Sequence, residues 1–210
     1  MALIERAVQG YRYVIEDLAD PRTKDWWLVA SPGPLMTILA AYLYFCIKAG
    51  PQYMKDKNPY QLKHAVMVYN VFQVAISVYM VYMVSHIARC FSVSRKEPTE
   101  IRTWAGAVWL YYFAKITELL DTVFFVLRKK TNQISFLHLY HHTTMPIIGW
   151  IGIKYAAGGS SIPEGAINSF IHILMYSYYL ISGLGPEYQK YLWWKKYITS
   201  LQLVSVSCNT

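Results

Sequence analysis

Three histidines, His138, His141 and His142, have the spacing that most clearly indicates chemistry in this 210-residue sequence. Positions i, i+3 and i+4 lie within an arc of about 100° on one face of a helix. One buried histidine is more often a hydrogen-bonded structural residue, whereas three imidazoles on one face favour a functional site. Imidazole can transfer a proton, attack a carbonyl group or bind a metal ion.

A second group combines charges of both signs within an otherwise apolar stretch. It comprises Lys115, Glu118, Asp121 and Thr122, which recur at helical spacing. Ionisable side chains inside a membrane are unfavourable and usually functional, so we favour a role in a site. The alternative is a buried ion-pair network that only fixes how helices pack, because opposite charges three residues apart can neutralise each other.

A third group forms a polar and aromatic stripe near the end of the sequence. Its members recur at i, i+4, i+7, i+8 and i+11 and are Asn168, His172, Met175, Tyr176 and Tyr179. Taken alone, such a stripe more often reflects helix packing through tyrosine hydroxyls. Together with the other two groups it indicates a shared polar chamber.

The elements that must position these groups are long segments with few or no charges. Trp27–Ile47 and Ala65–Ser85 have 21 residues each and Gly165–Pro186 has 22, and roughly 20 apolar residues cross a bilayer. Residues 131–153 hold the three histidines but no acid or strong base, and Thr103–Leu127 holds the charged group. The sequence therefore predicts five full transmembrane helices.

The two ends of the sequence differ from these spans. Residues 1–25 are rich in charge and lack an apolar run, which predicts an N-terminal extramembrane segment. Tyr197–Thr210 is apolar, but at about 1.5 Å per residue it reaches only about 21 Å into a hydrocarbon core of about 30 Å. We therefore expect an all-α, polytopic transmembrane helix bundle, with residues 26–210 as one domain containing a partial sixth span and C-terminally incomplete.

Charge is distributed unevenly between the two ends of the predicted bundle. If the spans alternate in direction, the loops at residues 48–64, 128–133 and 187–196 share one side and hold ten Lys or Arg against two acids. This basic side suits a polyanionic ligand, and anchoring to anionic headgroups is an equal alternative. The opposite side has nine Lys or Arg, so the count does not orient the chain.

Cysteine spacing indicates no metal centre. Cys46, Cys90 and Cys208 are far apart and form no CxxC pair, so neither a zinc site nor a disulfide framework is expected. None of them lies near the three polar groups, whereas an imidazole is largely neutral at pH 7 and can itself accept an acyl group. Histidine is therefore the best nucleophile available.

Three segments carry a resemblance to a known family. KITELLDT (Lys115–Thr122), HLYHH (His138–His142) and NSFIHILMYSYY (Asn168–Tyr179) occur in this order on consecutive predicted spans. With DPRTKDWWLVASPGP before the first span and YNVFQ at Tyr69–Gln73, they resemble the ELO family of very-long-chain fatty-acid elongases. A fourth family box, TxxQxxQ, is matched by Thr199 and Gln202, but Ser205 stands at its last position.

The resemblance implies a seven-span enzyme of the endoplasmic reticulum membrane. Such an enzyme is a very-long-chain 3-oxoacyl-CoA synthase, which condenses malonyl-CoA with a long acyl-CoA and releases carbon dioxide and coenzyme A. It implies no cofactor or metal beyond these substrates and no nucleic acid. Membrane lipid, other elongases, and the reductase and dehydratase of the elongation cycle are the implied partners.

The resemblance also implies a role for each group. Acyl transfer falls to His141, with His172 facing it, and orientation, proton transfer and enolate stabilisation fall to His138 and His142. The remaining residues are expected to bind substrate. Lys115, Glu118 and Asp121 would position the histidines or contact the thioester end, and Asn168 with Tyr176 would hold carbonyl oxygens. Tyr179 and Gln202 are also expected to bind substrate, and the coenzyme A phosphates would contact Arg128, Lys129 and Lys130.

Three alternatives remain open from the sequence. A chain without its last helices could be an inactive partner of full-length elongases. A membrane di-iron desaturase or hydroxylase also uses an HxxHH box but needs about eight histidines, and this sequence has six. A transporter or receptor could also use intramembrane charges, but no further feature indicates one.

Overall fold

The computed structural model describes residues 2–93, 98–157, 162–194 and 197. All regular secondary structure in these residues is helical, which confirms the predicted all-α class. The α-helices are α1 (Ala2–Arg12), α2 (Gly33–Tyr44), α3 (Gly50–Met54), α4 (Lys63–Val93), α5 (Pro98–Thr117), α6 (Leu119–Leu127), α7 (Phe136–Tyr155) and α8 (Ile162–Leu184). Short π or 3-10 helices are η1 (Tyr13–Asp17), η2 (Phe45–Ala49), η3 (Thr131–Gln133) and η4 (Pro186–Tyr191).

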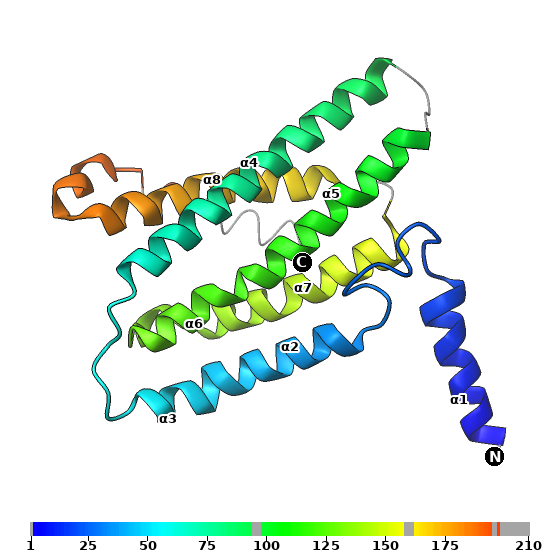
Figure 1. The fold of residues 1–210 in the computed structure, drawn as a ribbon, viewed down its shortest axis with the longest axis horizontal. Coiled ribbons are helices and arrows are strands. Elements are labelled where there is room, and N and C mark those ends of the chain that lie inside the picture. Colours follow the sequence, from blue (N-terminus) through cyan, green and yellow to red (C-terminus); the bar gives the residue numbers. More distant parts are fainter. Residues whose placement is uncertain (1, 94–97, 158–161, 195–196, 198–210) are drawn as a thin grey trace.

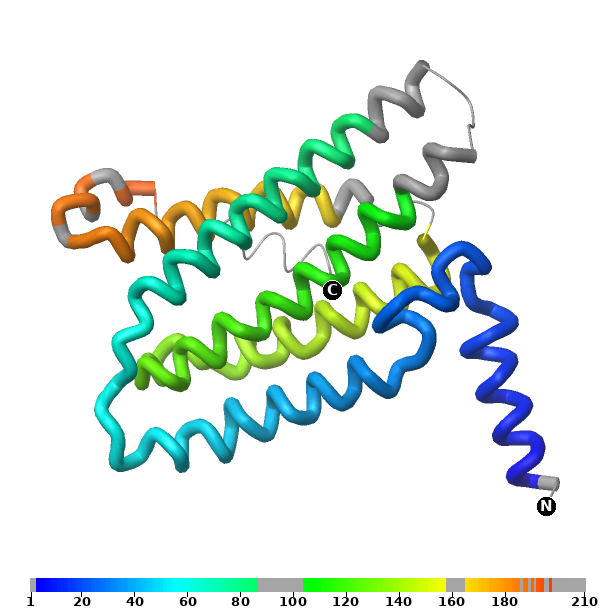
Figure 2. The backbone as a smooth tube through the Cα atoms, in the orientation of Figure 1, coloured from blue at the N-terminus to red at the C-terminus, as the bar shows by residue number. Residues whose placement is uncertain are grey.

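The long helices run side by side along a common direction, whereas α1 leaves the bundle across that direction (Figure 1). The tube in Figure 2 shows that α2, η2 and α3 form one nearly continuous rod. Helix α4 packs against α8, and α5 packs against α7, α4 and α8. Helix α5 therefore lies at the centre of the described bundle.

Two helical segments are long and apolar enough to cross a membrane, Gly33–Met54 and Lys63–His86. Large apolar side chains on the outside of α4 are exposed, with Val68 at 71% and Tyr82 at 56%. Exposed apolar surface of this kind is normal against lipid and unusual against water. The remaining three predicted spans correspond to α5 with α6, α7 and α8, whose number of membrane crossings stays a prediction.

The first span begins later than the sequence predicts, at Gly33 rather than Trp27, and its rod continues to Met54. Proline explains the shift, since Pro32 precedes the helix and Pro34 occupies its first turn, where a missing backbone N–H is tolerated. Upstream, Leu28 has a φ of 62°, which is incompatible with a continuous right-handed helix.

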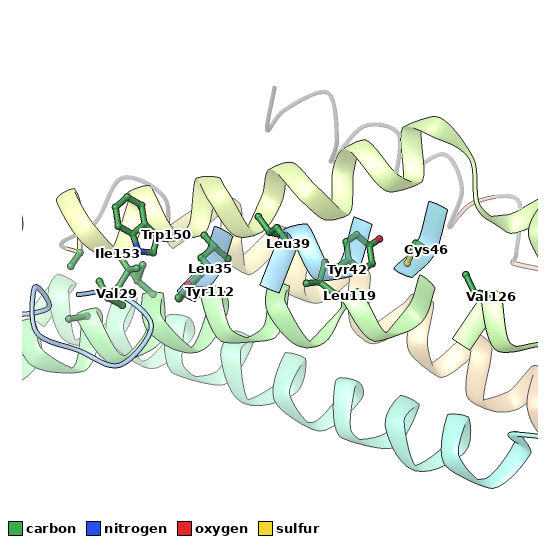
Figure 3. Packing of buried hydrophobic residues seen from close by; sticks show 13 residues of the cluster. Val29, Leu35, Leu39, Tyr42, Cys46, Tyr112, Leu119, Val126, Trp150 and Ile153 are labelled. Carbon is green, nitrogen blue, oxygen red and sulfur yellow. The ribbon is translucent and has the colours of Figure 1, made fainter. Parts of the chain in front are cut away.

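The main apolar core lies between α2, α5 and α7 (Figure 3). In this core Leu35 of α2 lies beside Tyr112 of α5, and Tyr42 of α2 lies beside Leu119 of α6. Gly149 of α7 lets that helix approach closely, because an added Cβ would lie 3.3 Å from the Tyr112 ring. Contact at this distance fixes the position of α7, the helix that carries three histidines.

A segment ahead of α2 holds the carboxyl end of α7. The backbone N–H of Asp20 donates to the Lys154 carbonyl (2.8 Å), and the Thr23 hydroxyl donates to the Ile153 carbonyl (2.7 Å). In return, the Lys154 ammonium donates to the Ala30 carbonyl (2.9 Å). These bonds satisfy carbonyls that a helix end leaves without internal partners. Part of the predicted extramembrane segment is thus tied to the bundle.

Candidate active site

The charged group lies at a break between α5 and α6. Glu118 occupies the junction, and the Asp121 N–H donates to the Glu118 carbonyl three residues back (3.1 Å) instead of to Thr117. The Thr117 carbonyl instead accepts the Tyr69 hydroxyl of α4 at 3.4 Å. The stretch predicted as one span is therefore two helices, because a side chain from α4 supplies the bond that the helix gives up.

Glu118 is the centre of a buried ionic cluster. Its carboxylate accepts two bonds from the Lys115 ammonium, at 2.8 and 2.9 Å, and one from Nδ1 of His172 at 3.0 Å. Lys115 also donates to the Asn168 amide oxygen at 2.6 Å. All four side chains are buried. The second and third sequence groups therefore meet, since α5 and α8 pack against each other.

Asp121 anchors a second polar chain. Its carboxylate accepts the Tyr176 hydroxyl at 2.6 Å, and that hydroxyl lies 3.4 Å from the hydroxyl of Tyr69. The Tyr69 oxygen also accepts the Gln73 amide N–H at 2.9 Å. Tyr69 and Gln73 belong to the YNVFQ segment, which is part of the family resemblance but received no role in the sequence analysis. They fix the ring of Tyr176 from the side of α4.

Helix α7 begins one turn before its histidines. Ser135 caps it, with the side-chain oxygen accepting the backbone N–H of His138 at 3.1 Å. The ring of His138 then lies 4.2 Å from that of His142, centroid to centroid, and Nε2 of His138 lies 2.9 Å from the Thr122 hydroxyl. No bond to a ring nitrogen of His141 is recorded among the described residues.

All four predicted catalytic histidines line one cavity of about 630 Å³. Carboxyl, amide and phenol groups of α6 and α8 face the same space. The predicted substrate residues on its wall are Glu118, Asp121, Asn168, Tyr176 and Tyr179. The three sequence groups thus share a chamber, as the sequence predicted.

Other predicted substrate residues lie elsewhere. Lys115 is not on the cavity wall and lies behind Glu118, to which it is bonded. Arg128, Lys129 and Lys130 are also absent from the wall, and the Lys129 ammonium donates to the Lys55 carbonyl at 3.1 Å. Gln202 lies outside the described residues. The phosphate-binding role of the three basic residues stays a prediction.

Three polar wall residues have no counterpart in the sequence prediction. Asn132, Gln133 and Ser135 contribute to the cavity from the loop between α6 and α7. Polar loop residues are common, and no periodicity marks these three. Their place next to HLYHH is the one signal that could have suggested them.

The residues that the structure describes contain no group of three histidine, cysteine or acidic side chains arranged to hold a metal ion. Imidazoles, carboxylates and phenols around one enclosed space nevertheless provide a nucleophile, proton carriers and hydrogen-bond donors.

A helical bundle with an apolar exterior and ionisable groups around an interior cavity is characteristic of a membrane-embedded enzyme. Residues 27–210 match the family described as ELO, the GNS1/SUR4 family, and the chain belongs to that family.

Its relatives include very long chain fatty acid elongase 7 of Rattus norvegicus, 46% identical over 96% of this chain and 74% of the relative. Very long chain fatty acid elongase 4 of Mus musculus is 46% identical over 94% of this chain and 65% of the relative. A very long chain fatty acid elongase of Aedes aegypti is 42% identical over 97% of this chain and 59% of the relative. The chain thus spans 59% to 74% of the length of these three proteins.

Proposed function

We propose that the protein is a very-long-chain 3-oxoacyl-CoA synthase that extends acyl-CoA by two carbons from malonyl-CoA, working as a multi-pass protein of the endoplasmic reticulum membrane. The observation that supports this most directly is the convergence of His141 and His172 on one cavity. Chemistry on lipid substrates requires such a site at membrane depth. The names of the relatives are consistent with the same reaction.

In the first half-reaction a ring nitrogen of His141 attacks the acyl-CoA carbonyl. A carbon–nitrogen bond forms, the carbon–sulfur bond breaks, and the coenzyme A thiolate takes the imidazole proton to leave as the thiol. His141 suits this step because none of the described residues forms a hydrogen bond with its ring nitrogens. A hydrogen-bond donor on the cavity wall, the amide of Asn168, stabilises the oxyanion.

In the second half-reaction malonyl-CoA loses carbon dioxide, and the electron pair of the broken carbon–carbon bond forms an enolate. The enolate carbon attacks the acyl-imidazole, a carbon–carbon bond forms, and the carbon–nitrogen bond breaks. The departing imidazole recovers a proton, so that the cycle consumes one proton overall. The Glu118–His172 pair faces this space and can hold or pass that proton.

The acyl chain runs between helices, where each buried methylene contributes about 0.8 kcal/mol. Apolar residues on the cavity wall, including Ile171 and Met175 of α8, are suited to contact it. Chain-length preference then depends on how deep the apolar space extends.

Malonyl-CoA-dependent elongation in membranes of a host without its own elongases tests the proposal. We expect activity from the chain, or from the chain extended with the carboxyl-terminal part of a relative, and loss of at least 100-fold in His141→Ala. His64→Ala is the matched control, because that histidine is exposed and outside the cavity.

Equal activity of His141→Ala and the parent would overturn the nucleophile assignment. Activity only in the extended chain would favour a partner role for the 210 residues alone.

A further inference from the structure

Three helices bring together a short hydrogen-bond chain that ends on His138. The Tyr42 hydroxyl of α2 lies 2.8 Å from the Thr122 hydroxyl of α6, which lies 2.9 Å from Nε2 of His138 on α7. Thr122 is fully buried and Tyr42 is 6% exposed. Neither hydroxyl therefore has ready access to bulk water.

The number of hydrogens available shows which group donates in each of these two hydrogen bonds. A hydroxyl has one hydrogen to donate, and a buried hydrogen without an acceptor is unfavourable by about 1–3 kcal/mol. Thr122 is the one recorded partner of the Tyr42 hydroxyl among the described residues. If Thr122 donated to Tyr42, the tyrosine hydrogen would have no recorded acceptor. Tyr42 therefore donates to Thr122, and Thr122 donates its own hydrogen to His138.

We infer that Tyr42 and Thr122 hold neutral His138 as the tautomer that carries its hydrogen on Nδ1, with Nε2 engaged as an acceptor. His138 is then a positioning residue: its Nε2 is not available to take an acyl group, and its ring packs against His142. The tautomer follows from the hydrogen bonds alone. Its consequence for catalysis rests on the proposed function and leaves His141 as the acyl carrier.

Substitutions distinguish the Tyr42–Thr122 hydrogen bond from the Thr122–His138 hydrogen bond. Thr122→Val removes both bonds with little change of shape, and Thr122→Ser keeps the hydroxyl and serves as the matched control. Tyr42→Phe leaves the Thr122 hydroxyl in place, and Nε2 of His138 is then the one acceptor for its hydrogen among the described residues. That variant therefore keeps the tautomer of the parent.

The test is solid-state NMR of the full chain in bilayers with 15N-labelled histidine, with the His138 signals identified by their loss in His138→Asn. We expect Nδ1 protonated and Nε2 unprotonated in the parent, in Thr122→Ser and in Tyr42→Phe, and mixed tautomers in Thr122→Val. A parent with Nε2 protonated would overturn the inference, as would signals of Thr122→Val identical to those of the parent. If Thr122→Val does not fold, the tautomer in the parent and in Thr122→Ser decides.

Elongation assays separate this inference from the proposed function. We expect Thr122→Val to lower kcat about 10-fold or more with little change in KM, and Thr122→Ser to restore it. An unchanged kcat in Thr122→Val would overturn the positioning role. If no form of the chain elongates acyl-CoA while the tautomer is as expected, the proposed function fails and the tautomer assignment stands.

Discussion

The histidines of the cavity differ in what holds them, and that difference separates their roles. His172 is bonded through Nδ1 to Glu118, and His138 is bonded through Nε2 to Thr122. His141 has no such recorded bond among the described residues. A ring fixed by a partner is suited to orientation or proton transfer, whereas a ring without one is available to attack.

Sequence spacing predicted that members of the three groups share one cavity, but not which hydrogen bonds hold their side chains. The positions i, i+3 and i+4 place His138, His141 and His142 on one helical face without tertiary information. The bond from Tyr42 to Thr122 joins residues 80 positions apart. No local periodicity reports such a contact, so the sequence could not assign Tyr42 a role.

At the residue scale, the two neighbouring tyrosines Tyr176 and Tyr178 form a matched pair. We expect Tyr176→Phe to lower the free energy of unfolding by about 1–3 kcal/mol, because buried Asp121 loses the hydroxyl that it accepts at 2.6 Å. Tyr178→Phe should have a smaller effect, since this ring packs edge-on against Trp194. Thermal unfolding of the detergent-solubilised protein measures both. A larger loss in Tyr178→Phe would contradict the assigned contacts.

At the scale of elements, the break at Glu118 is what turns its carboxylate and that of Asp121 toward different partners. The sequence predicted a single span from Thr103 to Leu127, because apolar composition carries no sign of a change in helix geometry. The polar neighbour that makes the break possible, Tyr69, lies on another helix. Helix boundaries set by tertiary hydrogen bonds were therefore beyond sequence reasoning. The start of α2 at Gly33 was also predicted wrongly, because counting apolar residues ignored Pro32 and Pro34.

Close packing between the α2 rod and α6 depends on Gly50. A Cβ at this position would lie 2.6 Å from a methyl group of Val126 and 2.8 Å from the Phe45 carbonyl. We expect Gly50→Ala to destabilise the protein by about 1–3 kcal/mol through overpacking. Denaturant or thermal unfolding in detergent measures the change.

Gly106 of α5 is the matched control for Gly50. An added Cβ there meets no atom within 4 Å. Alanine in a helix interior is favoured over glycine by about 0.5–1 kcal/mol, so Gly106→Ala should be neutral or stabilising. Equal destabilisation by the two substitutions would show that the close approach of the rod to α6 is not the cause.

At the scale of the whole molecule, the loop after α3 and the loop after α6 lie at the same end of the bundle. The Tyr60 N–H donates to the Leu127 carbonyl at 3.1 Å, and Lys129 reaches the Lys55 carbonyl. The cavity wall includes Asn132 and Gln133 from the second of these loops. On the proposed function, we expect the coenzyme A part of the substrate to enter from this end, where the sequence has the larger excess of basic residues.

Sidedness can be measured with single cysteines in sealed microsomes and a membrane-impermeant maleimide, in a chain whose native cysteines are replaced by serine. We expect Asn58→Cys and Thr131→Cys to be labelled from the same side, and Lys24→Cys from the other, because one helical rod separates Lys24 from Asn58. Labelling of Asn58→Cys and Thr131→Cys from opposite sides would contradict the arrangement of α4, α5 and α6.

The segment that holds the end of α7 has a practical consequence for anyone shortening or tagging this protein. Removing residues 1–25 as a dispensable leader would also delete the donors that Asp20 and Thr23 supply to the Lys154 and Ile153 carbonyls. The truncated product would lose the anchor for the helix that bears the HLYHH box. A fusion partner is therefore better joined ahead of Ala2, which leaves that anchor in place.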